Sequence, residues 1–216
     1  DVYKRQIITS IQVFATKADT VDEIFVTGGV KYKITSIEKK EVVVVGGQDS
    51  NTKQLYIPGK IKNGGIEYNV RQIADNAFKN CNELEEVSLP DTIETIGANA
   101  FQNDKKLTGL KLPKNIKTMG YGAFGECTGL TEIEIPKTLE KVWCAYYDSK
   151  SDGAFRGCSN LKDVRFEEGT KTVTEYVFKN CTGLEKITIP EGIETIGNGA
   201  FAGCSNLTDI IMSESV

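Results

Sequence analysis

Histidine is absent from the 216-residue sequence. Because histidine is the most common general base near neutral pH and a common metal ligand, its absence restricts any enzyme hypothesis to carboxylate, Lys, Tyr, Cys or Ser chemistry. A basic excess is also lacking, since the formal net charge is -4. Proteins that bind nucleic acids usually carry a surplus of Lys and Arg that contacts phosphates. We therefore expect no nucleic-acid partner.

Long apolar runs and closely paired cysteines are missing as well. No run reaches the roughly 18 apolar residues of a membrane-spanning helix, so no transmembrane segment is predicted. Six cysteines are present, but no two of them have the C-x-x-C spacing that is typical of structural zinc sites. The sequence consequently predicts no metal and no cofactor.

The strongest positive signal is a repeat with a period of 23 residues. Each unit contains a Phe that follows Ala or Val and precedes Cys by three positions (Asp104 in one unit) and Leu by six positions. An alternating apolar pair comes next, and in four units a Pro follows it. One unit is eight residues longer, with the extra residues in 143–151. The repeated phenylalanines are Phe78, Phe101, Phe124, Phe155, Phe178 and Phe201.

The order of residue types within one unit predicts the path of its backbone. Alternation in 86–89 (EVSL) predicts a short strand with Val87 facing the core, and Pro90 ends it by removing a backbone donor. Gly97 permits a tight bend, and 99–101 are predicted to open a short helical turn. A single unit cannot bury its own apolar residues. Stacked units can, so stability is expected to arise from contacts between neighbouring units.

The unit, written L-x-x-V-x-L-P-x-x-I-x-x-I-G-x-x-A-F-x-x-C-x-x, resembles the BspA-like leucine-rich repeats of bacterial surface proteins from roughly Leu55 to Met212. The resemblance implies an α/β repeat fold, a leucine-rich-repeat solenoid in which short parallel strands and short helical turns form a right-handed coil. Upstream, 31–35 and 41–47 read as strands, and such strand pairs are similar to the N-terminal caps of that family. We therefore expect an N-terminal β cap at 19–54 and repeats at 55–216.

Both ends of the sequence are unusual. Residues 1–6 (DVYKRQ) resemble the translation of an adapter used to prepare DNA sequencing libraries, so we expect a cloning or sequencing artefact there. Residues 7–18 resemble the end of a signal peptide with a small-residue cleavage site, and an ordinary first strand is the alternative. The last unit stops at Val216 without the polar cap that terminal repeats usually need, so we expect repeats truncated at the C-terminus.

Five of the six cysteines occupy one repeat position, which predicts a ladder of buried thiols in which Cys acts as a small apolar residue. A disulfide between neighbouring coils remains an alternative, because stacked coils are close enough to form one. Asp104 interrupts the ladder. Cys144 lies in the insertion, outside the ladder, and is predicted to be the most accessible cysteine.

Two patterns that could suggest enzyme chemistry are explained by the repeat. Residues 120–125 (GYGAFG) match the dinucleotide-binding fingerprint G-x-G-x-x-G, but that fingerprint requires a strand followed by a full helix, and these glycines fall at repeat positions. The acidic pairs at 85–86 and 167–168 are predicted to lie on solvated edges, whereas acid–base catalysis needs groups that converge in a cleft. No catalytic or cofactor-binding residue is therefore predicted.

The outward-facing residues of the predicted strands form the first candidate binding surface, because solenoids bind through extended faces. This row has mixed charge and contains Arg165 but no aromatic residue. The insertion supplies aromatic residues, which are enriched with Arg at binding hot spots, although Trp143 could instead pack back over the disrupted edge. The predicted protein-binding residues are Trp143, Tyr146, Tyr147, Glu132, Glu134, Asp163, Arg165 and Lys186.

These expectations favour a binding module over an enzyme. The family resemblance implies an adhesion-type module of a bacterial surface or extracellular protein, secreted through a signal peptide, with a protein ligand on a host or neighbouring cell. An architectural spacer or scaffold within a larger multidomain surface protein, with no activity of its own, is the alternative. An enzyme would require a catalytic domain outside these residues. The sequence predicts neither the identity of the ligand nor the oligomeric state.

Overall fold

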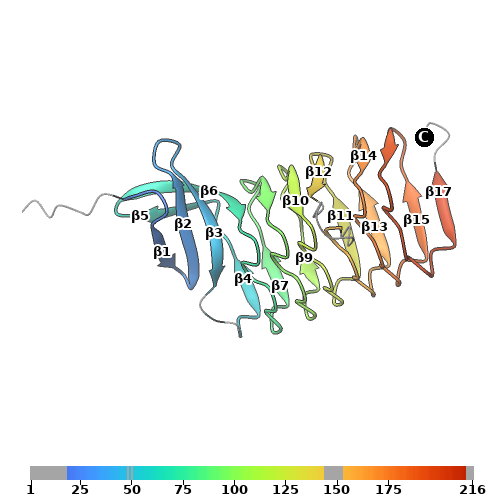
Figure 1. Cartoon of the computed structure of the whole chain (residues 1–216), viewed down its shortest axis with the longest axis horizontal. Helices are drawn as coiled ribbons and strands as arrows, with labels where there is room; N and C mark the ends of the chain where they lie inside the picture. The colour runs from blue at the N-terminus through green and yellow to red at the C-terminus, as the bar shows by residue number, and fades with distance from the viewer. Residues whose placement is uncertain (1–18, 48, 50, 144–152, 213–216) are drawn as a thin grey trace, which may run out of the picture.

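The computed structural model describes residues 19–47, 49, 51–143 and 153–212, and these residues form an N-terminal sheet followed by a stack of coils along one axis (Figure 1). A coil has three parts, as in the unit with β7 (Glu86–Ser88), β8 (Thr95–Ile96) and the turns of 98–103. We call these parts the first strand side, the second strand side and the turn side. The sides of successive coils stack upon one another.

The first strand side confirms the predicted alternation. In β11 and β15 the inward residues, such as Ile133 and Ile187, are buried, while their neighbours in the chain are exposed. The last strand, β17, differs, because its apolar residues Ile210 and Met212 are exposed. Strands of successive coils pair in parallel as β4–β7–β9, β11–β13 and β15–β17. Besides β7, this side comprises β4 (Gln54–Tyr56), β9 (Gly109–Leu110), β11 (Glu132–Ile135), β13 (Asp163–Phe166), β15 (Lys186–Ile189) and β17 (Asp209–Met212).

The second strand side is interrupted at the insertion. β8, β10 and β12 pair in parallel, and so do β14 and β16, but β12 and β14 are not hydrogen-bonded to each other. The insertion follows directly after β12 in the chain, so the break coincides with the departure from the 23-residue period. The strands are β10 (Thr118–Gly120), β12 (Lys141–Trp143), β14 (Thr172–Val173) and β16 (Thr195–Ile196).

The N-terminal sheet continues directly into the second strand side. β1 (Ile24–Thr27), β2 (Val30–Ser36) and β3 (Glu41–Gly47) are antiparallel neighbours, and β3 pairs in parallel with β6 (Ile66–Ile73), which in turn pairs with β8. β5 (Lys60–Asn63) forms an antiparallel pair with β6. This arrangement places the sheet at the N-terminal end of the stack.

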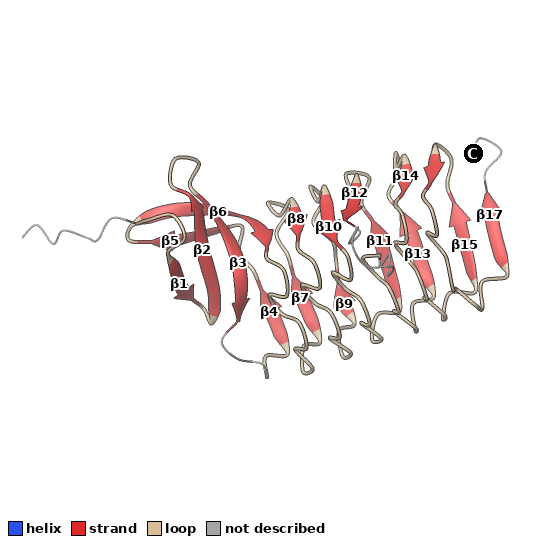
Figure 2. Ribbon diagram, viewed as in Figure 1, coloured by secondary structure: helices blue, strands red, loops and turns tan. Residues whose placement is uncertain are grey.

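The turn side contains turns and no helix, so the short helical turns expected from the sequence are not confirmed within the described residues (Figure 2). The reason lies in the hydrogen bonds. The amide of Phe78 donates to the carbonyl of Ala100 in the next coil at 2.7 Å, whereas a helix would keep that bond within its own coil. Asn76 and Asn80 also have positive φ angles of 56° and 64°, which interrupt helical backbone.

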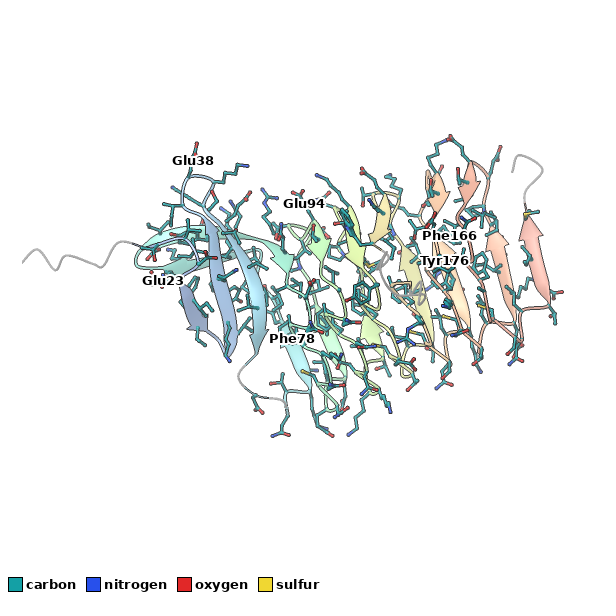
Figure 3. The ribbon with its side chains drawn as sticks, in the orientation of Figure 1. Glu23, Glu38, Phe78, Glu94, Phe166 and Tyr176 are labelled. Atoms are coloured by element: carbon teal, nitrogen blue, oxygen red, sulfur yellow. The ribbon has the colours of Figure 1, made fainter. Side chains whose placement is uncertain are left out.

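The repeated phenylalanines stack along the whole turn side, as a Phe-centred core requires (Figure 3 labels Phe78, the first of them). Neighbouring ring centroids lie 5.1 to 5.9 Å apart, and the planes of each pair are within 18° of parallel. Phe101, Phe124, Phe155 and Phe178 are fully buried. Offset stacking adds to the free energy gained from burying the rings, so this ladder joins the coils into one core.

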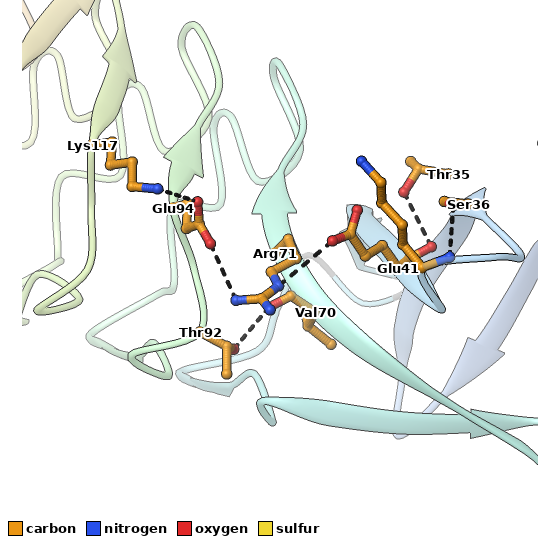
Figure 4. A network of polar contacts seen from close by, with 9 residues as sticks. Thr35, Ser36, Glu41, Val70, Arg71, Thr92, Glu94 and Lys117 are labelled. Carbon is orange, nitrogen blue, oxygen red and sulfur yellow. Dashed lines mark hydrogen bonds and ion pairs between the residues drawn. The ribbon is translucent and has the colours of Figure 1, made fainter.

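Ion pairs join the N-terminal sheet to the first coils on the second strand side (Figure 4). The Arg71 guanidinium lies 3.1 Å from the Glu94 carboxylate and 3.8 Å from that of Glu41. Lys117, one coil further on, lies 2.8 Å from Glu94. Exposed ion pairs contribute at most about 1 kcal/mol each, so the buried core supplies most of the free energy that holds the coils together.

Candidate functional site

Five of the eight predicted binding residues lie together on the first strand side. Glu132 and Glu134 of β11 pair in register with Asp163 and Arg165 of β13, and Lys186 begins the next strand, β15. All five side chains are exposed, because they occupy the outward positions of strands whose inward residues are buried. We call these five residues the charged row.

The ion pairs of Arg165 determine which charged side chains of the row remain available to a partner. Its guanidinium lies 3.0 Å from the Glu132 carboxylate and 3.0 Å from the Asp163 carboxylate. Arg165 therefore reaches back along the strand and away from Glu134, its partner in the strand register. Within the described part of the chain, Glu134 and Lys186 form no ion pair. A partner of complementary charge could contact both without displacing an existing pair.

Two hollows on the first strand side lie next to Glu134 and Arg165. One, of about 390 Å³, is lined by Lys111, Lys114 and Glu132, and the other, of about 570 Å³, is lined by Lys162, Lys186 and other residues. Glu134 and Arg165 line both hollows. The surface thus alternates between basic, acidic and basic stretches across β9, β11, β13 and β15. Such patterning gives an interface specificity and a fixed register.

Trp143 does not belong to this surface. It ends β12 on the second strand side, where it is 53% exposed and has the Lys141 ammonium 3.9 Å from its ring centroid. A partner lying flat on the charged row would therefore not contact the Trp143 ring. Tyr146 and Tyr147, which the sequence groups with Trp143, lie outside the described residues.

A hollow of about 280 Å³ adjoins Trp143, and its lining was not predicted from the sequence. It lies where β12 and β14 fail to pair. One signal could have identified it, because Trp143 and Thr174 occupy the repeat position at which other coils have Gly97, Gly120 or Gly197. The lining includes Glu140, Lys141, Trp143, Thr172, Thr174, Glu175 and Thr195.

Comparison with known proteins agrees with this architecture. The family model for the BspA type leucine rich repeat region matches in six copies over residues 52–151 and 147–216. The chain belongs to this family. The matched model describes a repeat region and no enzyme, and no curated protein matches the chain.

Solved structures of other bacterial leucine-rich repeat proteins share the fold of this chain. A leucine rich repeat protein of T. pallidum has a TM-score of 0.66 and 22% identity over 88% of this chain and 82% of that one. A leucine-rich repeat protein from Bacteroides ovatus gives 0.63 and 26%, over 86% and 52%. A leucine rich cell surface protein from Faecalibacterium prausnitzii gives 0.57 and 25%, over 92% and 57%. This BspA-type chain thus spans little more than half of the last two.

The described cysteines of this BspA-type chain confirm the predicted thiol ladder. All five are free, and four of them are buried. Each buried thiol donates a hydrogen bond to the carbonyl of a Phe in the preceding coil, at 3.0 to 3.2 Å, as Cys127 does to Phe101. Burial raises the pKa of these thiols, which suppresses the reactive thiolate. The ladder is therefore structural.

Thiol labelling of the native protein should follow this burial. Cys144 is expected from the sequence to react first, although it lies outside the described residues. Cys81 is half-buried, and burial raises the pKa of its thiol to about 11, so it should react more slowly. Cys127, Cys158 and Cys181 should react only as fast as the protein unfolds. Mass spectrometry of timed samples measures the order, and rapid modification of all six would contradict the ladder.

The described residues offer no arrangement typical of an active site. The glycines of 120–125 serve packing, since a Cβ at Gly120 would collide with the backbone of Ala98 in the preceding coil. The carboxyl with the most strongly raised pKa, that of Asp104, is fully buried in the thiol ladder and cannot reach a substrate. No group of three or more potential metal ligands occurs in the described ranges. These ranges also hold no helix that could cross a membrane.

Proposed function

We propose that this chain is a protein-binding, adhesion-type module of an extracellular or bacterial cell-surface protein, and that the charged row is its binding face. The observation that carries the proposal is the charged row itself. It is an exposed, regularly spaced set of side chains on one face of the stack, and among the described residues Glu134 and Lys186 form no ion pair that a partner would have to displace. Solenoids commonly bind through such extended faces. The ligand would be a protein on a host or neighbouring cell.

Family membership supports this location and role. The BspA type repeat region is a repeat architecture, and the similar protein from Faecalibacterium prausnitzii is described as a cell surface protein. We propose no enzymatic activity and no cofactor for these residues. The sequence-based assignments of residues 1–6 to an adapter and of 7–18 to a signal-peptide remnant remain part of the same proposal.

An architectural spacer remains the second candidate, because contacts between neighbouring coils continue along the length of the stack. The phenylalanine ladder runs from Phe78 to Phe201, and the Arg71, Glu94 and Lys117 ion pairs connect the cap to the coils. Such a stack would hold another domain away from a surface without binding anything itself.

Exchanging charges in the charged row tests the binding proposal. The double variant Glu134→Lys with Arg165→Glu keeps the net charge and alters only exposed side chains, so it should fold. Because the partner's charges must complement the row, we expect saturable binding to immobilised host extracellular-matrix proteins or to neighbouring bacterial cells to weaken at least about tenfold. Surface plasmon resonance or a cell-binding isotherm measures the change.

The matched control exchanges Lys171→Glu with Glu194→Lys. These residues form an exposed ion pair of 2.9 Å on the second strand side, away from the row. The control should bind like the parent chain. Equal binding by all three proteins would remove the charged row from the proposal, and the absence of saturable binding to any of these surfaces would favour the spacer.

A further inference from the structure

The hollow beside Trp143 requires an explanation of its own, because it lies on a different side of the coil from the charged row. We propose that this hollow is a binding site for a sugar ring, a pyranose such as the terminal unit of a surface glycan. The proposal does not depend on protein binding by the charged row.

The hollow lies at the junction where the later of the two coils has Thr174 instead of a glycine at one repeat position. At Gly97, Gly120 and Gly197 a Cβ would collide with the backbone of the preceding coil, so glycine permits the close approach of coils there. Trp143 and Thr174 occupy this position in consecutive coils. Trp143 nevertheless pairs in register with Gly120 of the coil before it. At the next junction Thr174 places a side chain where glycine would permit close approach to the preceding coil, and there β12 and β14 do not pair.

The two coils separate only on the second strand side, and this limits the size of a ligand that can bind between them. On the turn side of the same two coils, the Phe124 and Phe155 ring centroids are 5.5 Å apart, and the Phe124 amide donates to the Ala154 carbonyl at 2.8 Å. On the first strand side, β11 and β13 pair along their full length. The coils therefore keep ordinary spacing on two of three sides. An added β-strand would need about 4.8 Å more, so a compact ligand fits better than an inserted peptide strand.

The buried hydroxyl of Thr174 points to a polar ligand. Thr174 is 7% exposed, lines the hollow, and its Oγ1 has no hydrogen-bond partner among the described residues. A buried polar group without a partner has lost its hydrogen bonds to water without replacing them. A ligand hydroxyl that bonds to this Oγ1 would replace one of those hydrogen bonds on binding.

The remaining lining matches the two kinds of surface that a pyranose presents. A sugar ring has apolar C–H faces and an edge of hydroxyl groups. The Lys141 ammonium lies over one face of the half-exposed Trp143 indole, so the ring offers a sugar its opposite apolar face and its polar N–H. Glu140 and Glu175 supply carboxylate acceptors for hydroxyl groups, and the hydroxyls of Thr172 and Thr195 can both donate and accept. The hollow of about 280 Å³ is near the lower end of small-ligand sites.

The fluorescence of Trp143 provides a direct test, because it is the single tryptophan of the chain. The probes are a panel of methyl pyranosides with gluco, galacto, manno and N-acetylglucosamine configurations. We expect at least one to change the emission with saturation. At about 0.3 kcal/mol for each of roughly 13 non-hydrogen atoms, the dissociation constant should be on the order of 1 mM. An acetylated polar hexapeptide serves as the competing probe.

Thr174→Val separates a binding role of the hydroxyl from a structural one. It removes the unpartnered Oγ1 while keeping the shape, so the melting temperature should not fall, and sugar affinity should drop about three- to tenfold. Thr188→Val makes the same change on the first strand side and should bind sugar normally. Trp143→Ala, followed by saturation-transfer NMR, should abolish binding.

Three outcomes would overturn the proposal. The first is an emission that no pyranoside changes at about 50 mM. The second is unaltered affinity in Thr174→Val. The third is a response to the hexapeptide but to none of the sugars, which would assign the hollow to a peptide.

Discussion

Replacing Phe124 with Ala is expected to lower the free energy of unfolding by about 3–5 kcal/mol, the usual cost of truncating a fully buried Phe. The Phe124 side chain is inaccessible to solvent, and its ring centroid lies 5.1 Å from that of Phe101 and 5.5 Å from that of Phe155. Truncation leaves a cavity and breaks the stack on both sides. Because neighbouring coils are held together by such contacts, the loss should appear as a lower urea midpoint for the whole domain.

Phe201→Ala provides the matched control at the C-terminal end of the same ladder. Phe201 is partly exposed, and among the described rings it stacks only on Phe178, at 5.9 Å. Its truncation removes fewer contacts and leaves a site that water can fill, so the loss should be less than half of that for Phe124→Ala. Equal losses in the two variants, or an unchanged unfolding curve for Phe124→Ala, would contradict a core that is centred on the phenylalanines.

The strands and the buried ladders could be predicted because their signals repeat. Alternation in 132–135 assigned Ile133 to the core and Glu132 and Glu134 to the surface, and the structure agrees. The 23-residue recurrence of Phe and Cys required those residues to stack, since every coil places the same position in the same environment. In each case the same requirement for burial recurs in several coils. The repeated pattern is therefore a stronger signal than the secondary-structure propensity of any single segment.

The turn side could not be predicted in the same way, because helices and stacked turns can share a sequence. A short run such as 76–81 (NAFKNC) is compatible with a helical turn if its amides bond within the coil. Here the Phe78 amide bonds to the next coil instead, a choice that depends on stacking and not on the run itself. The asparagines gave a weak local hint, since Asn tolerates the positive φ that Asn76 and Asn80 adopt.

Of the two candidate sites, one could be predicted from the repeat pattern and the other could not. The charged row follows from strand alternation, and its five residues lie together as expected. The insertion predicts Trp143 as a separate candidate, and the structure places it on the second strand side, away from the charged row. The Trp143 hollow depends on a departure from the repeat, the replacement of glycine by Thr174 at the junction of β12 and β14. A departure is visible in the sequence, but its consequence for coil spacing requires the structure.

Asp104 is expected to make the protein less stable as the pH rises from about 4 to about 8. Asp104 takes the place of a ladder cysteine and is fully buried. Its Oδ1 accepts the Cys81 amide at 2.7 Å, while its buried Oδ2 has no hydrogen-bond partner within the described ranges. Burial raises the pKa of this carboxyl from its ordinary value near 3.8 to about 8, against a smaller lowering by the Cys81 amide bond. Protonation gives Oδ2 a donor, the group that the thiols provide at this position in other coils.

The sign of the effect follows from the direction of that pKa shift. Because the folded protein holds the proton more tightly than the unfolded chain, the stabilisation is fully present below about pH 4 and is lost as the pH approaches 8. A shift of about four units corresponds to at most about 5–6 kcal/mol. The ion-paired carboxylates have the opposite effect at more acidic pH. Lys117 lowers the pKa of Glu94 below its ordinary value, so the stabilisation from that pair is lost as the pH falls through the lowered pKa.

Asp104→Asn isolates this contribution, because the amide keeps the acceptor for Cys81, supplies an N–H donor and does not titrate. Unfolding by urea at several values between pH 5 and pH 8.5 should show the parent losing several kcal/mol relative to the variant, with the variant the more stable at pH 8.5. Asp104→Cys, which restores the ladder residue, should show the same flat profile. Parallel curves for parent and variants across this range would mean that Asp104 is ionised in the folded protein at pH 5, and that the coils provide for a buried carboxylate in some other way.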